Sequence, residues 1–446
     1  MSYVPHSEAD RKEMLRTAGV SSEEELYADI PEKLRLKREL DLPPALSEWE
    51  AVRALHGLAG ENRNLLCFAG AGYYDHHVPA AVDHLIRRSE FYTAYTPYQA
   101  EVSQGTLQSI YEFQSMVCEL MGLDVANASM YDGASAMAEA ALMAHAIQKK
   151  RDKIVLSITA NPHYRQVLDT YNLGLQLPVE IAARTKGGVT DLEALKKAVD
   201  SNTAAVIIQS PNFYGIIEDL EAAAGIAHDA GALLIAVVDP VSLAVLKSPG
   251  ACGVDIAVAE GQPFGVPLSY GGPVLGLFAA RQEHIRHMPG RIVGATEDVD
   301  GRRGFVLTLQ TREQHIRREK ATSNICTNQG LMMLATTIYL STAGRQGLRQ
   351  VAETSAQVAH YAYERIAKET SLEPMFPDAP FFREFTLKTP VPAREIIGKG
   401  AERGVLAGVA LSRFPHIDVE DGLLLAFTEK RSKADVDLLL EVLKEA

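Results

Sequence analysis

Asp239 and Gln262 are the two residues around which the chemistry of this sequence is organised. Asp239 directly follows the apolar run 232–238, and a second apolar run, 254–259, opens into a glycine-rich stretch that contains Gln262. In enzymes that use pyridoxal phosphate, an aspartate at the end of such a strand pairs with the pyridine nitrogen, and a lysine farther on forms a Schiff base. No lysine occurs within residues 251–281, and Gln262 stands where that lysine is expected. The sequence thus predicts a cofactor-type pocket without its reactive amine.

Two other lysines are candidates for the missing amine. Lys247 follows Asp239 too closely and is expected on the surface at a helix end, whereas Lys320 lies in a basic run beyond the sheet. Neither follows a strand end, where open α/β sheets bind their ligands. Without a lysine, pyridoxal phosphate would be held only by noncovalent contacts. We therefore expect this chain to be unable to run the chemistry of this cofactor alone.

A turn at the start of an alanine-rich segment is a candidate phosphate site. Residues 131–133 lead from an expected strand at 125–130 into an alanine-rich helix, and Ser135 lies in its first turn. Alanine favours helix, and the free N–H groups and the dipole of a helix N-terminus attract anions. Asp132 would repel a phosphate, so we expect this site to be empty.

Residues 91–105 combine aromatic and small polar side chains. The segment FYTAYTPYQAEVSQG carries four aromatic residues within its first eight positions, with threonine, glutamine and serine nearby. Aromatic hydroxyls beside small polar groups suit a binding surface. A tyrosine-rich loop packed beneath a domain explains the same composition, and the residue types do not separate these two interpretations.

The sequence has no pattern typical of a metal site. His76 and His77 are adjacent, so they point in different directions on a helix or a strand, and we expect surface or interface positions rather than chelation. The four cysteines are scattered without a CxxC pair, at Cys67, Cys118, Cys252 and Cys326. This usage predicts a reduced, metal-free protein of the cytosol.

The elements that position these residues alternate between strand and helix. Helices are expected at 106–121 and 191–199, the latter with Thr190 and Glu193 as a capping box. The alternation predicts an α/β fold with a mostly parallel sheet covered by helices. Apolar runs predict strands at 154–159, 204–209, 232–238, 254–259, 274–279 and 305–310.

The same pattern divides the chain into regions. Ser47 and Glu50 form a capping box for a helix that runs to Gly60, in a polar segment that we interpret as an arm. Two long helices, 331–342 and 346–368, begin a smaller C-terminal domain. The expected regions are a helical arm, a large α/β domain and a small α+β domain, at 1–64, 65–328 and 329–446.

The composition limits the kinds of partner. The chain has 446 residues, is 47% hydrophobic and carries a formal net charge of −13. A nucleic acid or an anionic membrane surface would require a basic face, so neither is expected as a partner. No apolar run approaches the length of a membrane span.

Four longer strings point to a family. They are YTPYQAEVSQG (95–105), NASMYDGASAMAEA (127–140), GQPFGVPLSYGGP (261–273) and REKATSNICT (318–327). Together they resemble the glycine cleavage system P-protein, specifically the alpha, or N-terminal, subunit of its two-chain form. The resemblance covers essentially the whole chain, and such long strings are far more specific than a three-residue motif.

The resemblance implies a fold and a reaction. The fold is that of the fold-type-I pyridoxal phosphate enzymes, and the alpha and beta subunits work together as an α2β2 heterotetramer. Pyridoxal phosphate on the beta subunit binds glycine, carbon dioxide leaves, and the aminomethyl group passes to the lipoyl arm of the H-protein. The Schiff-base lysine belongs to beta, so the resemblance implies a degenerate cofactor pocket in this chain, formed by Asp132, Ser135, Asp239 and Gln262.

The resemblance also implies a contribution to the partner's site. Fold-type-I sites lie at a dimer interface, so the beta site would need side chains from this chain. Their expected work is positioning, through hydroxyl and amide contacts to the cofactor phosphate or the substrate carboxylate. The candidates are Tyr95, Thr96, Tyr98, Gln99, Thr322, Ser323 and Asn324.

Three other functions stay open from the sequence. The chain could be a self-sufficient pyridoxal phosphate enzyme whose lysine lies elsewhere, or a non-catalytic scaffold that stabilises beta or recruits the H-protein. A dinucleotide enzyme would also show the alternation of strands and helices. The glycine runs at 70–72 and 271–272 lack the GxGxxG spacing that such an enzyme needs.

Overall fold

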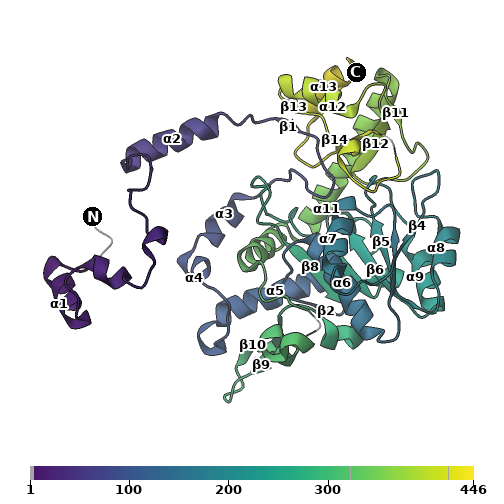
Figure 1. Ribbon diagram of the computed structural model, residues 1–446. Helices are drawn as coiled ribbons and strands as arrows, with labels where there is room; N and C mark the ends of the chain where they lie inside the picture. The colour runs from purple at the N-terminus through teal and green to yellow at the C-terminus, as the bar shows by residue number, and fades with distance from the viewer. Residues whose placement is uncertain (1–4, 322, 420, 446) are drawn as a thin grey trace. The chain divides into compact units, whose positions relative to one another are not determined.

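The apolar runs of the sequence lie side by side in a seven-stranded sheet (Figure 1). The computed structural model describes residues 5–321, 323–419 and 421–445. Strand β8 is antiparallel to its neighbours, and the other neighbouring pairs are parallel, so the sheet is mostly parallel as predicted. In spatial order the strands are β2 (Val125–Ala126), β8 (Gly276–Ala280), β7 (Ile256–Glu260), β6 (Leu233–Val238), β5 (Thr203–Ser210), β3 (Lys153–Ser157) and β4 (Val179–Ala182).

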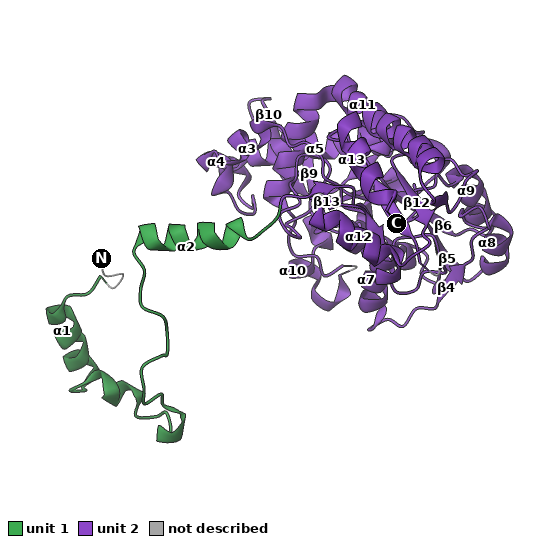
Figure 2. Ribbon diagram, turned by 90° about the horizontal axis from the view of Figure 1, so that it is seen from above, with its two compact units in different colours: residues 1–63 green, residues 64–446 purple. Residues whose placement is uncertain are grey.

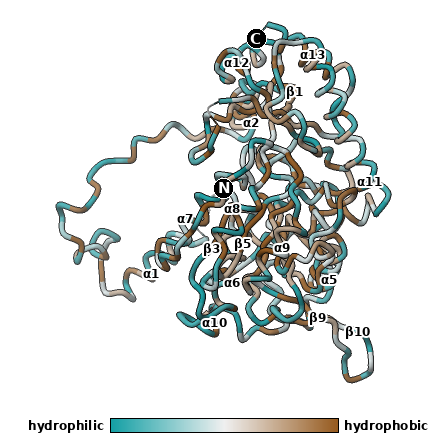
Figure 3. The backbone as a smooth tube through the Cα atoms, turned by 90° about the vertical axis from the view of Figure 1, so that its right-hand side faces the viewer, coloured by the Kyte–Doolittle hydropathy of each residue, from teal (hydrophilic) through white to brown (hydrophobic). Residues whose placement is uncertain are grey.

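Helices cover both faces of this sheet. Along β6, Leu234 and Ala236 pack in one core with α5 (Gln104–Met121) and α9 (Leu220–Asp229). Leu233 and Ile235 pack in another core with α6 (Gly133–Ile147) and α7 (Pro162–Asn172). Because successive side chains enter opposite cores, the strand is an unbroken apolar run, and Figure 3 shows such hydrophobic stretches inside the body.

The predicted helix 191–199 is present, but its cap is a different residue. The helix is α8 (Leu192–Ala198), and the carboxylate of Asp191 accepts the N–H groups of Glu193 and Ala194 at 2.9 and 3.1 Å. Thr190 is buried and donates its N–H to the carboxylate of Glu218 instead. Asp and Thr are both good N-cap residues, and here the aspartate is the one that directly precedes the first helical residue.

Two strand predictions need correction. The run at 305–310 does not join the main sheet, because β10 (Arg303–Thr308) pairs with β9 (Ile292–Glu297) in a separate antiparallel hairpin. The expected strand 125–130 is confirmed only over Val125–Ala126. Strand β4 was not predicted, since it is a short edge strand with an exposed glutamate and partly buried neighbours.

The C-terminal region forms a second, antiparallel sheet. The two predicted long helices are one element, α11 (Gly330–Glu369), interrupted at Gly344, which has φ 59° and ψ −175°. The sheet order is β11 (Glu373–Pro374), β12 (Glu384–Lys388), β15 (Leu423–Ala426) and β14 (Val409–Ala410). Helices α12 (Ala393–Glu402) and α13 (Lys433–Leu443) accompany it, and β1 (Leu66–Cys67) pairs in parallel with β13 (Val405–Leu406). Short helices α3 (Ala80–Ile86), α4 (Ser89–Tyr92) and α10 (Gln314–Arg317) complete the body.

The chain divides into two units, Met1–Arg63 and Asn64–Ala446 (Figure 2). The first contains α1 (Glu8–Ala18) and α2 (Glu48–Gly60). The predicted capping box of Ser47 and Glu50 is confirmed at α2. Among residues 5–63 none is buried, so this unit has no core of its own.

Candidate functional site

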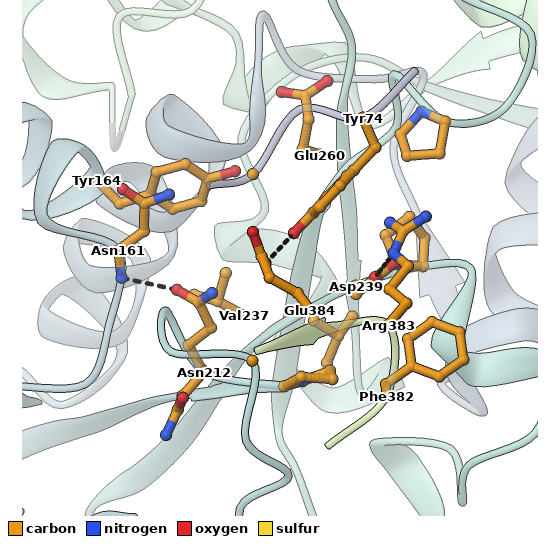
Figure 4. Close-up of a pocket in the computed structure, with 17 residues that line it drawn as sticks. Tyr74, Asn161, Tyr164, Asn212, Val237, Asp239, Glu260, Phe382, Arg383 and Glu384 are labelled. Carbon is orange, nitrogen blue, oxygen red and sulfur yellow. Dashed lines mark hydrogen bonds and ion pairs between the residues drawn. The ribbon is translucent and has the colours of Figure 1, made fainter. Parts of the chain in front are cut away.

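Asp239 lies at the carboxyl end of β6, and its charge is paired inside the chain. The Nε atom of Arg383, directly before β12, lies 2.7 Å from Oδ2 of Asp239 (Figure 4). The Arg383 side chain is 1% exposed and stacks over the ring of Tyr74 at 3.8 Å. Oδ1 of Asp239 accepts the N–H of Val241 at 2.9 Å. A buried pair of this kind is stable only while both charges are present.

Gln262 is 2% exposed, and backbone groups take up its side chain. Its Nε2 donates to the carbonyls of Tyr74 at 3.1 Å and Val266 at 2.8 Å. Its Oε1 accepts the N–H of Tyr74 at 3.0 Å. Gln262 therefore joins the loop after β1 to the loop after β7, and neither of its amide N–H groups is left for a ligand.

Glu260, the last residue of β7, lies against the N-terminus of α6. Its Oε2 accepts the N–H of Gly133 at 2.9 Å, and its Oε1 accepts those of Gln262 and Leu275 at 3.0 and 3.1 Å. Burial raises the pKa of Glu260 to about 8, and the backbone donors act in the opposite direction. Sequence reasoning missed this residue, although it follows an apolar run in the same way as Asp239 does.

The predicted phosphate turn is capped by its own side chains. Asp132 is the N-cap of α6, and its Oδ1 accepts the N–H of Ser135 at 2.7 Å. The hydroxyl of Ser135 accepts the N–H of Asp132 at 3.2 Å, which completes a capping box. Together with Glu260, two acidic side chains thus accept N–H groups in the first turn of this helix.

Side-chain contacts also hold the remaining wall of the pocket. The hydroxyl of Tyr74 donates to Oε2 of Glu384 at 2.8 Å, and burial raises the pKa of Glu384 to about 7. His76 contacts Nη1 of Arg383 through Nε2, and its Nδ1 lies 2.6 Å from the carboxylate of Glu429. The surface or interface position expected for His76 is therefore wrong, because the side chain is buried. Burial, followed by the charge of Arg383, lowers its pKa.

These contacts leave little room. The volume open to the centre of a water molecule is about 40 Å³, and no lysine occurs among the residues that line the pocket. Lys247 is exposed and pairs with Glu221 on the surface. The pocket of this chain therefore does not fit pyridoxal phosphate: its volume is too small, its hydrogen-bond donors are already taken, and it has no reactive amine.

The candidate interface residues lie in a different part of the body. Tyr95 and Tyr98 are 82% and 56% exposed, Gln99 is exposed, and Thr96 is half-buried. Tyr95 and Thr96 line a second cavity of about 220 Å³ together with Thr327 and Asn328. The structure thus joins the aromatic segment to residues 327–328, which begin three residues after the predicted string 322–324.

The other three candidates come before residues 327–328 in the sequence, and the two that the structure describes do not line that cavity. Ser323 accepts the N–H of Ile325 at 3.1 Å. Burial raises the pKa of Glu139 to about 7, and Ser323 acts in the opposite direction. Asn324 is exposed. Thr322 lies outside the described residues.

Arg291 connects the aromatic segment to the segment before α11. Its side chain is buried, and Nη2 donates to the hydroxyl of Tyr98 at 3.3 Å and to the carbonyl of Cys326 at 2.7 Å. Its Nη1 donates to Oδ1 of Asn328 at 3.2 Å. Sequence reasoning missed Arg291, since a single arginine before a strand carries no motif.

The described residues show neither a metal-type cluster nor a membrane-spanning helix. Among them, no group of three or more His, Cys, Asp and Glu side chains could hold a metal ion. No helix within the described ranges is long and apolar enough to cross a membrane. All four cysteines have free thiols.

The fold is that of the fold-type-I pyridoxal phosphate enzymes, with a mostly parallel sheet, a strand-end aspartate and a small C-terminal sheet. Glutamate decarboxylase of Lactobacillus brevis shares it with a TM-score of 0.70 at 12% identity, over 94% of this chain and 98% of that chain. The sphingosine-1-phosphate lyase of Burkholderia pseudomallei shares it with a TM-score of 0.67 at 15% identity, over 94% of each chain. At these identities the likeness is one of fold alone.

The chain belongs to the glycine cleavage system P-protein family, whose sequence profile matches residues 1–443. An inhibitor-bound crystal structure of glycine decarboxylase (P-protein) matches with a TM-score of 0.90 and 44% identity, over 100% of both chains. The probable glycine dehydrogenase (decarboxylating) subunit 1 of Carboxydothermus hydrogenoformans is 52% identical over 446 residues, 99% of each chain. The corresponding subunit 1 of Chlorobaculum tepidum is 53% identical over 440 residues, 98% of each.

Proposed function

We propose that this chain is the alpha subunit of a heteromeric, cytoplasmic glycine decarboxylase of α2β2 type. The partner beta subunit holds pyridoxal phosphate, which supplies the electron sink for loss of carbon dioxide from glycine. The aminomethyl group then passes to the lipoyl arm of the H-protein. One observation carries the proposal: the chain keeps the family's fold over its whole length, yet its own pocket contains Gln262 and an internal Asp239–Arg383 pair.

In this proposal, the chain's contribution to the beta site comes from its exposed aromatic segment and the segment before α11. Tyr95, Tyr98 and Gln99 are open to a partner, and Arg291 holds Tyr98 beside residues 326–328. Hydroxyl and amide groups held in this way can orient a phosphate or a carboxylate without taking part in bond making. Thr96, Ser323 and Asn324 complete the contribution among the described residues, and Thr322 belongs to the same string.

A non-catalytic scaffold that stabilises beta or recruits the H-protein is the second candidate. It is favoured by the first unit, where large apolar side chains are exposed and none of the described residues is buried. Exposed apolar surface of this extent is typical of a protein interaction site. A self-sufficient pyridoxal phosphate enzyme has no such support, because no lysine lines the pocket.

Reconstitution separates these functions. Release of carbon dioxide from carboxyl-labelled glycine is measured with the chain alone, the beta subunit alone and both together, with lipoylated H-protein present. The proposal predicts activity only for the pair. Activity of the chain alone would establish the self-sufficient enzyme, and a pair that keeps full turnover when the aromatic segment is changed, as in Tyr95→Phe, would reduce this chain to a scaffold.

A further inference from the structure

The carboxyl group of Glu260 occupies the place where a phosphate would be bound. In this fold the anion site is the N-terminus of the helix that faces the strand ends, which here is α6. The N–H of Gly133, the first residue of α6, is taken by Oε2 of Glu260. A Cβ atom at Gly133 would lie 2.4 Å from the hydroxyl of Tyr164 and 2.9 Å from the N atom of Glu260. The helix and the strand end are therefore packed directly together, with the carboxyl group between them.

The guanidinium of Arg383 occupies the partner position of Asp239. A strand-end aspartate of this fold meets the protonated nitrogen of the cofactor ring. Here a protein cation lies 2.7 Å from the same carboxylate, and it stacks on Tyr74 in the pocket (Figure 4). A cofactor ring would have to displace a side chain that is 1% exposed, and the displaced charge would stay buried.

The third contact, the amine, is replaced as well. Gln262 makes three hydrogen bonds to backbone groups of Tyr74 and Val266, so the position carries a structural bridge. The remaining volume of about 40 Å³ is far below the roughly 150 Å³ of an engineered cavity that accepts benzene. A ring that bears a phosphate therefore has no room.

We propose that this chain carries an internal substitute for its cofactor: the Glu260 carboxyl group replaces the phosphate, and Arg383 replaces the ring nitrogen. The pocket is thus closed to pyridoxal phosphate and to other phosphate-bearing ligands. It differs from an active site in these two replacements as well as in the missing lysine. The consequence is specific: restoring the lysine alone does not restore the cofactor, whereas restoring it and removing both the Glu260 carboxyl group and the Arg383 guanidinium does. This property resides in the isolated chain and does not depend on how the beta subunit works.

The test compares three variants of the full chain: Gln262→Lys, Gln262→Lys with Glu260→Ala and Arg383→Ala, and Gln262→Lys with Glu221→Ala and Arg302→Ala. Glu221 and Arg302 are exposed, and their removal is the matched control. Each variant is titrated with pyridoxal phosphate, reduced with borohydride and mapped by peptide mass spectrometry, and its fold is checked by circular dichroism. We expect an adduct at position 262 only in the combination that removes Glu260 and Arg383, with binding about tenfold or more tighter than in the other two.

Two results would overturn the proposal. One is stoichiometric uptake of pyridoxal phosphate at position 262 by Gln262→Lys alone. The other is a folded combination without Glu260 and Arg383 that binds no more tightly than the control without Glu221 and Arg302. The wild-type chain adds a measurement that needs no variant: its melting temperature should not change with pyridoxal phosphate or inorganic phosphate, and a saturable rise with either ligand would contradict closure.

Discussion

The guanidinium of Arg291 donates to the hydroxyl of Tyr98, 3.3 Å away, from a position that is itself buried. The same group donates to the carbonyl of Cys326 and to the side chain of Asn328. Two segments far apart in the sequence, 95–99 and 323–328, are thereby held against one cation. The contact with the Cys326 carbonyl, at 2.7 Å, has the short length of a charge-assisted hydrogen bond, so Arg291 is expected to hold the two segments together.

Arg291→Gln should lower the turnover of the αβ complex about 10- to 100-fold, because small displacements of positioning groups have effects of that size. Arg291→Lys should recover only part of this loss, since an ammonium cannot reproduce the guanidinium fork. Steady-state kinetics with glycine give kcat and KM for each variant. Arg302→Gln, at an exposed arginine, is the control. A complex that assembles normally and turns over normally with Arg291→Gln would refute the positioning role.

Tyr95→Phe and Asn324→Ala should each lower turnover while the heteromeric complex stays intact. The reason is that both side chains are exposed on this chain alone and have polar groups available to a partner's site. Gel filtration checks assembly, and carbon dioxide release checks turnover. Tyr270→Phe, at another exposed tyrosine, serves as the comparison. If both variants keep normal turnover, the assignment of these residues to the beta site is wrong.

Asp239→Asn should reduce the free energy of unfolding by about 3 kcal/mol, because it leaves the charge of Arg383 buried and unpaired. The exposed pair of Asp300 and Arg302, with 3.7 Å between its charged atoms, provides the contrast. Asp300→Asn should cost less than about 1 kcal/mol. Chemical denaturation of both variants measures the difference. Equal losses of stability would mean that the buried pair of Asp239 and Arg383 matters no more to folding than an exposed ion pair.

The stability of the chain should contain a contribution that is lost as pH rises. Burial raises the pKa of Glu260 to about 8 from its ordinary value of 4.5, so the folded chain keeps a proton that the unfolded chain releases. The contribution is fully present below pH 4.5 and disappears as the pH rises through about 8, at up to about 1.4 kcal/mol per pH unit. Glu260→Gln removes this titration. The free energy of unfolding, measured by denaturation at several pH values in this range, should therefore depend less on pH in the variant than in the wild type. An equal pH dependence in both would contradict the assignment.

Much of the large domain follows from local patterns. The run 232–238 predicts β6 because both of its faces are buried, and Gly122 ends α5 in the left-handed conformation that a sequence with glycine there favours. The missing lysine is equally local, since it depends only on which residue stands after β7. Those features required no knowledge of which segments meet.

The features that the sequence did not reveal depend on distant segments. His76 is buried because Arg383 and Glu429 come to it from the C-terminal domain. Strand β10 pairs with its neighbour β9, and nothing in its apolar run distinguishes a hairpin from a place in the main sheet. The role of Glu260 depends on α6, whose first N–H lies beside it only in the folded chain.

The most direct test of the account is the absorbance spectrum with pyridoxal phosphate of this chain alone, of the beta subunit with this chain, and of each after addition of glycine. The chain alone is expected to show no band of lysine-bound cofactor, and the pair is expected to show one that changes with glycine. A band in the chain alone, with borohydride trapping the cofactor on one of its own lysines, would contradict the central claim and establish an independent pyridoxal phosphate enzyme.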